Sequence, residues 1–376
     1  MEFQYYLPVN LVFGKGKSLF IGEKAAALGK KAMIVTGGSS TKRSGLLGKT
    51  GEQLRDKNIP YVIFDKVTPN PLTTTVLEGA AIAQAEGCDV VIALGGGSSI
   101  DAAKGIAFQA VNGDDINDYI FGRKSSDKAL PIIAVPTTCG TGSEGNGFAV
   151  MTNPESKDKK SLRCSAIVPA CSIIDPLLMA TMPKDILASV GFDALCHNID
   201  GYISSIAQPM TDILALEGAR LAINCLKKVY ANPTDMEGWE GLCLASTLGG
   251  MVINTAGVTA LHGMEHPVSG LKDVVHGRGL AALAPAVFEE SIKGDPKKFT
   301  ILSRLLGGRD ENDFMDKINE LIHELKLNTT LGDMGIKNDD VDWLAENCMK
   351  VSAASIANHP VVFSVEDLKR IYRKAI

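Results

Sequence analysis

The sequence predicts an α/β first half followed by an all-α second half. In the first half, short β-branched apolar runs return about every 30 residues, with amphipathic segments between them. Strands that alternate with helices in this way indicate βαβ units and a parallel sheet. From Lys184 onward, Ala and Leu recur at spacings of three and four, which indicates a helical bundle. We therefore expect two domains, 1–183 and 184–376, since one core seldom grows past about 250 to 300 residues.

The individual elements follow from local patterns along the chain. Strands are expected at 31–36 (KAMIVT), 61–65 (YVIFD), 89–94 (DVVIAL) and 130–135 (LPIIAV), with further strand-like pieces at 148–152, 161–164 and 172–174. Helices are expected at 73–86 and 100–111, and the run 213–226 (ILALEGARLAINCL) is typical of the second half. The strand-like runs give way to helical patterns after the pairs Asp175-Pro176 and Met182-Pro183, which places the domain boundary near Pro183.

Composition excludes several classes of protein. The chain is 45% apolar and 22% charged with a net charge of -5, which fits neither a disordered chain nor a basic nucleic-acid binder. Eight scattered cysteines without a CxxC pair predict inert thiols in a reducing compartment. The first residues lack the pattern of a signal peptide, and no apolar stretch approaches the roughly 18 to 20 residues of a membrane span. We expect a cytoplasmic protein without a membrane partner.

Two glycine-rich loops predict a nucleotide site. Residues 95–105 (GGGSSIDAAKG) follow a predicted strand and open a helix, where backbone N–H groups and the helix N-terminus favour a phosphate. The alternative is a tight turn with Ser98 or Ser99 as the helix cap. The pattern is neither GxGxxG, because Ile100 stands where a glycine is needed, nor a Walker A loop. Residues 136–144 (PTTCGTGSE) follow the next strand, and in a parallel sheet both loops leave the edge where ligands bind.

Four of the six histidines fall in one stretch of 80 residues and predict a metal site. Asp193 and His197 are four apart in a helical pattern, and His262 and His266 repeat that spacing, which puts each pair on one helix face. With His276, these side chains suit a divalent transition metal in a helical bundle. Taken singly, each pair could instead be exposed to solvent, or be buried with its hydrogen bonds made inside the core. The HxxEH pattern at 262–266 also matches an inverted zincin metalloprotease, which would leave both glycine loops without a role.

These motifs together resemble the iron-containing (group III) alcohol dehydrogenase family, in its butanol dehydrogenase and NADPH-aldehyde reductase branch. The resemblance runs essentially end to end and rests on GGGSSIDAAKG at 95–105, PTTCGTGSE at 136–144, GFDALCHNID at 191–200 and HGMEHPVSGLKDVVHG at 262–277. It implies a dehydroquinate synthase-like fold, in which an N-terminal dinucleotide-binding domain and a C-terminal helical domain enclose a cleft. It also implies a homodimer or higher homo-oligomer that interconverts a small alcohol and its aldehyde or ketone with NAD(P).

The resemblance assigns roles residue by residue. The four metal ligands would be Asp193, His197, His262 and His276, holding Fe2+ in first place and Zn2+ in second. His266 would lie by the nicotinamide as a proton relay. The cofactor contacts would be Gly96, Gly97 and Ser98 at the pyrophosphate, together with Asp101, Thr137, Thr138, Thr141, Lys159 and Leu178. Lys160, next to Lys159, leaves the lysine assignment open by one position.

Two departures from the family pattern bear on specificity. Many members carry an aspartate after the first long strand, whereas this chain has Gly37, Gly38, Ser39 and Ser40 there, followed by Lys42 and Arg43. Loss of that carboxylate relieves repulsion against a 2'-phosphate, so we expect these residues to contact the cofactor and to favour NADP over NAD. The second departure is Glu265, with the Gly145-Asn146-Gly147 stretch. Glu265 could point away from the site, and the glycines could enlarge the pocket or loosen a loop.

Two other functions remain open at this level. A dehydroquinate synthase-like lyase would use the same fold, NAD and one metal, but it needs a basic pocket, and Lys272 and Arg278 form no obvious cluster. A non-catalytic binding module is disfavoured because all four ligand positions are filled. The substrate stays open among short linear alcohols, diols, and lactaldehyde-like or anionic aldehydes.

Overall fold

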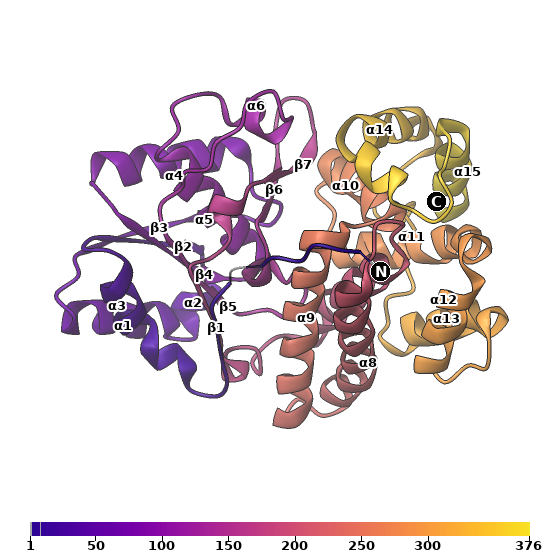
Figure 1. The fold of residues 1–376 in the computed structure, drawn as a ribbon, viewed down its shortest axis with the longest axis horizontal. Coiled ribbons are helices and arrows are strands. Elements are labelled where there is room, and N and C mark those ends of the chain that lie inside the picture. Colours follow the sequence, from indigo (N-terminus) through magenta and orange to yellow (C-terminus); the bar gives the residue numbers. More distant parts are fainter. Residues whose placement is uncertain (1, 8) are drawn as a thin grey trace.

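Six parallel strands form the sheet of the N-terminal half, in the order β1-β8-β5-β4-β2-β3 (Figure 1). The computed structural model describes residues 2–7 and 9–376. The strands are β1 (Leu11–Phe13), β2 (Ala32–Gly37), β3 (Tyr61–Val67), β4 (Val90–Gly95), β5 (Ile132–Pro136) and β8 (Cys171–Ile174). β1 was not predicted, because three residues at a sheet edge are too few to show a pattern. The predicted parallel α/β half is confirmed.

Helices cover both faces of this sheet, which explains why its central strands are apolar without alternation. All residues of β4 and β5 are buried. One face packs against α1 (Ile21–Leu28) and α3 (Leu46–Asp56). The other face packs against α4 (Thr73–Ala85), α5 (Gly97–Gln109) and α6 (Ile116–Ile120). The helix predicted at 100–111 is α5, which begins three residues earlier than predicted. Its N-cap is Gly96, so neither Ser98 nor Ser99 caps it.

An antiparallel hairpin of β6 (Phe148–Thr152) and β7 (Lys159–Arg163) extends from the sheet domain, with Val150 opposite Ser161. The strand predicted at 161–164 thus begins two residues earlier. Charged residues at its start weaken the apolar pattern that sequence inspection relies on. Because side chains alternate along a strand, Lys159, Ser161 and Arg163 share one face of β7, and all three line a cavity.

All regular elements of the second half are helices among its described residues, as predicted. The helices are α7 (Lys184–Ile203), α8 (Pro209–Ala231), α9 (Met236–Ala256), α10 (Ala260–Lys272), α11 (His276–Ser291), α12 (Pro296–Leu305), α13 (Phe314–Glu324), α14 (Val341–Ala357) and α15 (Val365–Ala375). They share one apolar core. Among the described residues no single helix has the length and apolarity to span a membrane, although α9 and α10, bent by 102° at their junction, meet both criteria as a pair. The domain boundary near Pro183 stays a prediction.

The two halves meet backbone to backbone where the 136–144 loop crosses α9. A Cβ at Gly250 would lie 1.9 Å from the Gly142 carbonyl oxygen, and Gly142 itself has a φ of +58°. Beside this contact, Thr247 Oγ1 donates to Glu144 Oε1 at 2.7 Å. Glycine at both positions is therefore required for the loop to reach the helix.

We predict that Gly250→Ala destabilises the protein by about 1 to 3 kcal/mol, because the methyl group must displace backbone rather than a flexible side chain. The measurement is the urea midpoint of unfolding. Gly48→Ala is the matched control: Gly48 is an exposed residue of α3 with no atom near its would-be Cβ. That change should stabilise the helix by up to about 1 kcal/mol. Equal midpoints for the two variants would contradict the close approach.

Candidate active site and metal centre

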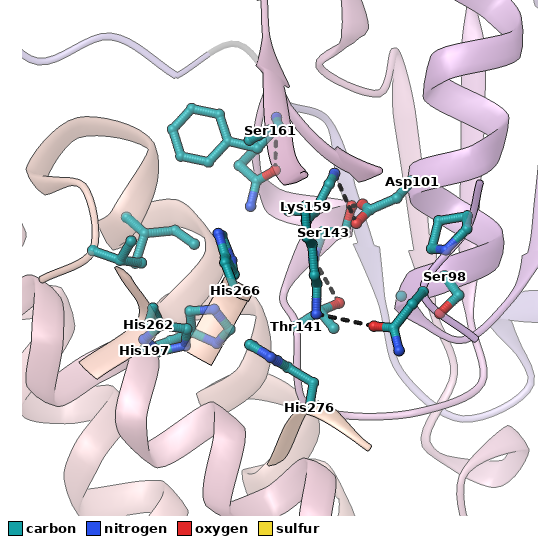
Figure 2. Close-up of a pocket in the computed structure, with 18 of the residues that line it drawn as sticks. Ser98, Asp101, Thr141, Ser143, Lys159, Ser161, His197, His262, His266 and His276 are labelled. Atoms are coloured by element: carbon teal, nitrogen blue, oxygen red, sulfur yellow. Dashed lines mark hydrogen bonds between the residues drawn. The ribbon is translucent and has the colours of Figure 1, made fainter. Parts of the chain in front are cut away.

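A cavity of about 120 Å³ lies between the two halves and gathers residues from both. In Figure 2 the labelled histidines from the helical half face the glycine loop and β7 of the N-terminal half. The predicted site residues that line it are Gly97, Ser98, Asp101, Thr141, Lys159, His197, His262, His266 and His276. Phe148, Val150, Ile253 and Val258 add apolar wall. The two motif groups of the sequence therefore share one chamber.

The glycine turn after β4 brings the N-terminus of α5 to the cavity. Gly95 has a φ of +152°, a conformation that L side chains rarely adopt. The neighbouring loop packs on this turn, because Thr137 N donates to the Gly95 oxygen at 2.9 Å. A Cβ at Gly97 would lie 2.3 Å from Thr141 Cγ2, so the loops fit only without a side chain there. The first N–H groups of α5 could hold a phosphate in this arrangement.

A buried lysine fixes the second loop. Lys104 Nζ donates to the carbonyl oxygens of Ser143, Asn146 and Phe148, at 2.6, 2.8 and 2.8 Å. Burial lowers the pKa of Lys104 to about 8, and the nearby Asp101 carboxylate opposes that shift. The carboxylate of Asp101 accepts from Ser143 Oγ at 2.6 Å and from Val150 N at 3.1 Å. Asp101 thus holds the loop, and its contact with a cofactor stays a prediction.

The glycines of the Gly145-Asn146-Gly147 stretch serve close packing. A Cβ at Gly147 would lie 2.5 Å from the Cys164 oxygen, and one at Gly145 would lie 3.0 Å from the Thr247 oxygen. Asn146 is buried, and its side chain accepts from Phe148 N at 3.0 Å. The loop is therefore held on several sides, which argues against the loosening that the sequence left open.

The remaining predicted cofactor residues lie outside the cavity wall. Gly37 ends β2, and Gly38, Ser39 and Ser40 lead into α2 (Ser40–Arg43), at the same sheet edge as the glycine turn. Lys42 is paired with Asp65 of β3, while Arg43 is exposed and has no ion pair among the described residues. Leu178 packs where two apolar cores meet. Lys160 Nζ donates to the Val351 oxygen, so Lys159 is the lysine of the cavity.

Three helices bring the predicted metal ligands together. Ligand atoms of Asp193 on α7, His262 on α10 and His276, the first residue of α11, all lie within 4.8 Å of one another. Asp193 Oδ1 is 3.4 Å from His262 Nε2 and 3.7 Å from His276 Nε2. His197 lies outside this set, but its Nδ1 is 3.2 Å from the same oxygen, and its ring stacks on His262 with centroids 4.3 Å apart.

The cluster fits a divalent cation. His197 Nδ1 is buried and, although Asp193 Oδ1 lies 3.2 Å away, the two atoms do not have the geometry of a hydrogen bond. A buried polar atom left in this way is unusual unless a ligand completes its contacts. Burial lowers the pKa of His197 to about 4, so its ring is neutral, as a metal ligand must be. Burial opposes ionisation of Asp193, but its close contacts with the three surrounding imidazoles, including a hydrogen bond with His262, hold the pKa of that carboxyl well below its usual range. One carboxylate and several imidazoles suit Fe(II), Zn(II) or Co(II).

Asp200 supports His262 from behind and was missed at the sequence level. Its carboxylate lies 2.8 Å from His262 Nδ1 and accepts from Thr259 N at 2.9 Å and Thr259 Oγ1 at 2.7 Å. The other ring nitrogen of His262 is thereby turned toward Asp193. A signal did exist, because residues 193, 197 and 200 follow the i, i+4, i+7 spacing of one helix face.

His266 lines the cavity beside the cluster without joining it. Its ring centroid is 6.0 Å from that of His276. Burial lowers the pKa of His266 well below its usual value, and the charge of Lys159 adds to the effect. The residue therefore presents a neutral imidazole at neutral pH. Glu265 is bonded to His276 rather than free to act as a base, which leaves the inverted zincin hypothesis without support.

Known proteins match this chain over nearly its whole length. A family model described as iron-containing alcohol dehydrogenase matches residues 8–176, and one described as the C-terminal part of the Fe-containing alcohol dehydrogenase family matches 187–376. The 1,3-propanediol dehydrogenase of Klebsiella pneumoniae is 34% identical, over 99% of this chain and 98% of its own. The NADH-dependent butanol dehydrogenase A of Clostridium acetobutylicum is 30% identical, over 100% of both chains.

Solved structures agree with these sequence matches. The crystal structure of an archaeal halo-thermophilic alcohol dehydrogenase from a Red Sea brine pool superposes with a TM-score of 0.96 at 32% identity. The match covers 100% of this chain and 99% of that one. Agreement of this extent includes both halves and their relative placement.

We predict that metal affinity rises with pH. Burial opposes it, but hydrogen bonds with Asp193 and Asp200 raise the pKa of His262 to about 9 in the metal-free protein. Binding at Nε2 requires the neutral ring, so below that pKa each metal ion displaces one proton. The apparent association constant for Zn2+, measured by chelator competition, should rise roughly tenfold per pH unit from about pH 7 and level off near pH 9.

A second variant, Asp200→Asn, removes one of the charges that raise the pKa of His262. Its affinity should level off at a lower pH than that of the parent protein. A pH-independent affinity in the parent would contradict the proposed protonation of His262.

Proposed function

The chain belongs to the iron-containing alcohol dehydrogenase family, and on that premise we propose that it interconverts a small alcohol and its aldehyde or ketone in the cavity between its halves. The observation that carries this proposal is that the N-terminus of α5 and the histidine cluster line the same cavity. A cofactor bound at the glycine turn could therefore reach a substrate held at the cluster.

Each group of residues has a part in the proposed reaction. Asp193, His197, His262 and His276 would hold the metal, and Gly96, Gly97 and Ser98 would bind the pyrophosphate, with Thr137, Thr138 and Thr141 beside it. When bound, a divalent metal supplies Lewis-acid polarisation and a nicotinamide supplies the hydride. His266, neutral because of its burial, can accept the proton of an alcohol and return it during reduction.

The finer cofactor choices are also proposals. We propose iron as the native metal with zinc second, although simple affinity favours zinc. We propose NADP over NAD, supported by the absent carboxylate at residues 37–40 and the free charge of Arg43. Two matched relatives, by contrast, are named as NADH- or NAD-dependent. A homodimer or higher homo-oligomer working in the cytoplasm completes the proposal.

The test is a panel of short aldehydes with the iron-loaded protein and reduced cofactor. We expect net consumption of NAD(P)H, and loss of both metal content and activity in His262→Ala. Because a Lewis-acid metal contributes several kcal/mol, kcat/KM should fall by at least about 100-fold.

His323→Ala is the control, since His323 is an exposed residue of α13. It should keep parental metal content and rate. Retained metal and activity in His262→Ala would reject the proposed site. Cofactor recycling without net consumption would favour the lyase instead.

Arg43→Ala tests the choice between NADP and NAD. If the guanidinium meets the 2'-phosphate, kcat/KM with NADPH should fall about tenfold, equivalent to one charge-assisted hydrogen bond. The value with NADH should stay unchanged, which serves as the internal control. A parent enzyme that strongly prefers NADH in steady-state kinetics would overturn the NADP proposal.

A further inference from the structure

Glu265 is a fully buried carboxylate next to a residue of the candidate metal centre. It lies on α10 between His262 and His266 and accepts hydrogen bonds from His276 Nδ1 and from Ser269 Oγ. Lys159 Nζ, from the other half of the molecule, lies 3.5 Å from the same carboxylate. A buried charge is expensive unless paired and hydrogen-bonded, and here each condition is met.

The helix that carries His276 leaves room for this carboxylate. Gly279 is three residues after His276, on the same face of α11. A Cβ at Gly279 would lie 2.8 Å from Glu265 Oε1 and 3.0 Å from Glu265 Cγ. The two helices can therefore place a carboxylate directly behind the histidine ring only because residue 279 has no side chain.

The same network holds the segment that leads into α11. Lys159 Nζ donates to Asn70 Oδ1 at 2.9 Å. Asn70 Nδ2 in turn lies 2.8 Å from Asp273 Oδ1 and 3.2 Å from the Val274 oxygen. Asn70 thus fixes the segment just before His276, and Glu265 fixes the ring of His276 itself.

We propose that Glu265 is a positioning residue that sets the tautomer and orientation of His276, and that Lys159 holds Glu265 in place from the N-terminal half. With the Nδ1 proton donated to Glu265, the lone pair of Nε2 faces Asp193 Oδ1, 3.7 Å away. This inference rests on the proposed role of His276 as a metal ligand. It gives Glu265, a departure from the family pattern, a specific task on this chain.

The experiment measures Co2+ binding by metal-free protein, with no turnover required. Partners behind a ligating histidine typically contribute 10- to 100-fold in metal affinity, so Glu265→Ala should bind Co2+ about 10 to 100 times more weakly than the parent. Glu265→Gln keeps an acceptor oxygen for the Nδ1 proton, so it should recover much of the loss. The visible spectrum of bound Co2+ should shift in Glu265→Ala and return toward the parental spectrum in Glu265→Gln.

Asp158→Asn is the matched control. Asp158 is another buried carboxylate that joins the halves, bonded to Asn347 Nδ2 at 2.7 Å and to Lys350 Nζ. It touches no proposed ligand, so its variant should keep parental Co2+ affinity and spectrum.

Parental affinity in Glu265→Ala, with weakened binding in His276→Ala, would overturn the positioning role and leave the proposed function standing. Equal loss in Glu265→Ala and Asp158→Asn would also overturn it, because the effect would then be general destabilisation. If the parent protein itself failed to bind Co2+, that result would contradict the metal site of the proposed function, and the role of Glu265 with it. Should Glu265→Ala not fold, Lys159→Met replaces it, with a smaller loss of affinity expected.

Discussion

The buried charge of Asp193 is the constraint on which the site depends. A carboxylate deep in a helical core is unfavourable unless cations, hydrogen bonds or a metal compensate it. Three helices each place one imidazole near it, with a ring nitrogen 3.2 to 3.7 Å from Asp193 Oδ1. Two further carboxylates, Asp200 and Glu265, then orient the histidines from behind. The apolar core that α7, α10 and α11 share holds these groups in place.

The nucleotide half meets this centre through contacts that tolerate little change. Gly142 and Gly250 allow backbone to touch backbone. Lys104 on α5 holds the segment 143–148 by donating hydrogen bonds to three of its carbonyl oxygens. The hairpin β6–β7 then reaches over the cavity and delivers Lys159 to Glu265. The distance between the glycine loops and the histidine cluster is therefore set by close packing, which the proposed hydride transfer between a bound cofactor and substrate would require.

Much of the fold could be predicted because its signals are local. The runs at 31–36, 61–65 and 89–94 lie within strands β2, β3 and β4 apart from Lys31 and Asp89. The interior strands β2 and β4 are buried almost throughout, and such parallel strands are nearly continuous apolar runs. β1 could not be predicted, because the residues of β8 with which it pairs lie 161 positions further along the chain. The start of β7 was hidden for a related reason: the partners of the Lys159 charge, Asn70 and Glu265, are distant in the sequence.

The sequence alone determined the two-part architecture, the two glycine loops and the identity of the histidines, because helix and strand periodicity and i, i+4 spacing are properties of neighbouring residues. Only the tertiary structure decided that Asp193, His262 and His276 converge, that Asp200 and Glu265 stand behind the rings, and that Lys159 faces the cavity. These are contacts between segments from Asn70 to His276, and their geometry arises from how helices pack. Spacing along the chain carries no information about that packing.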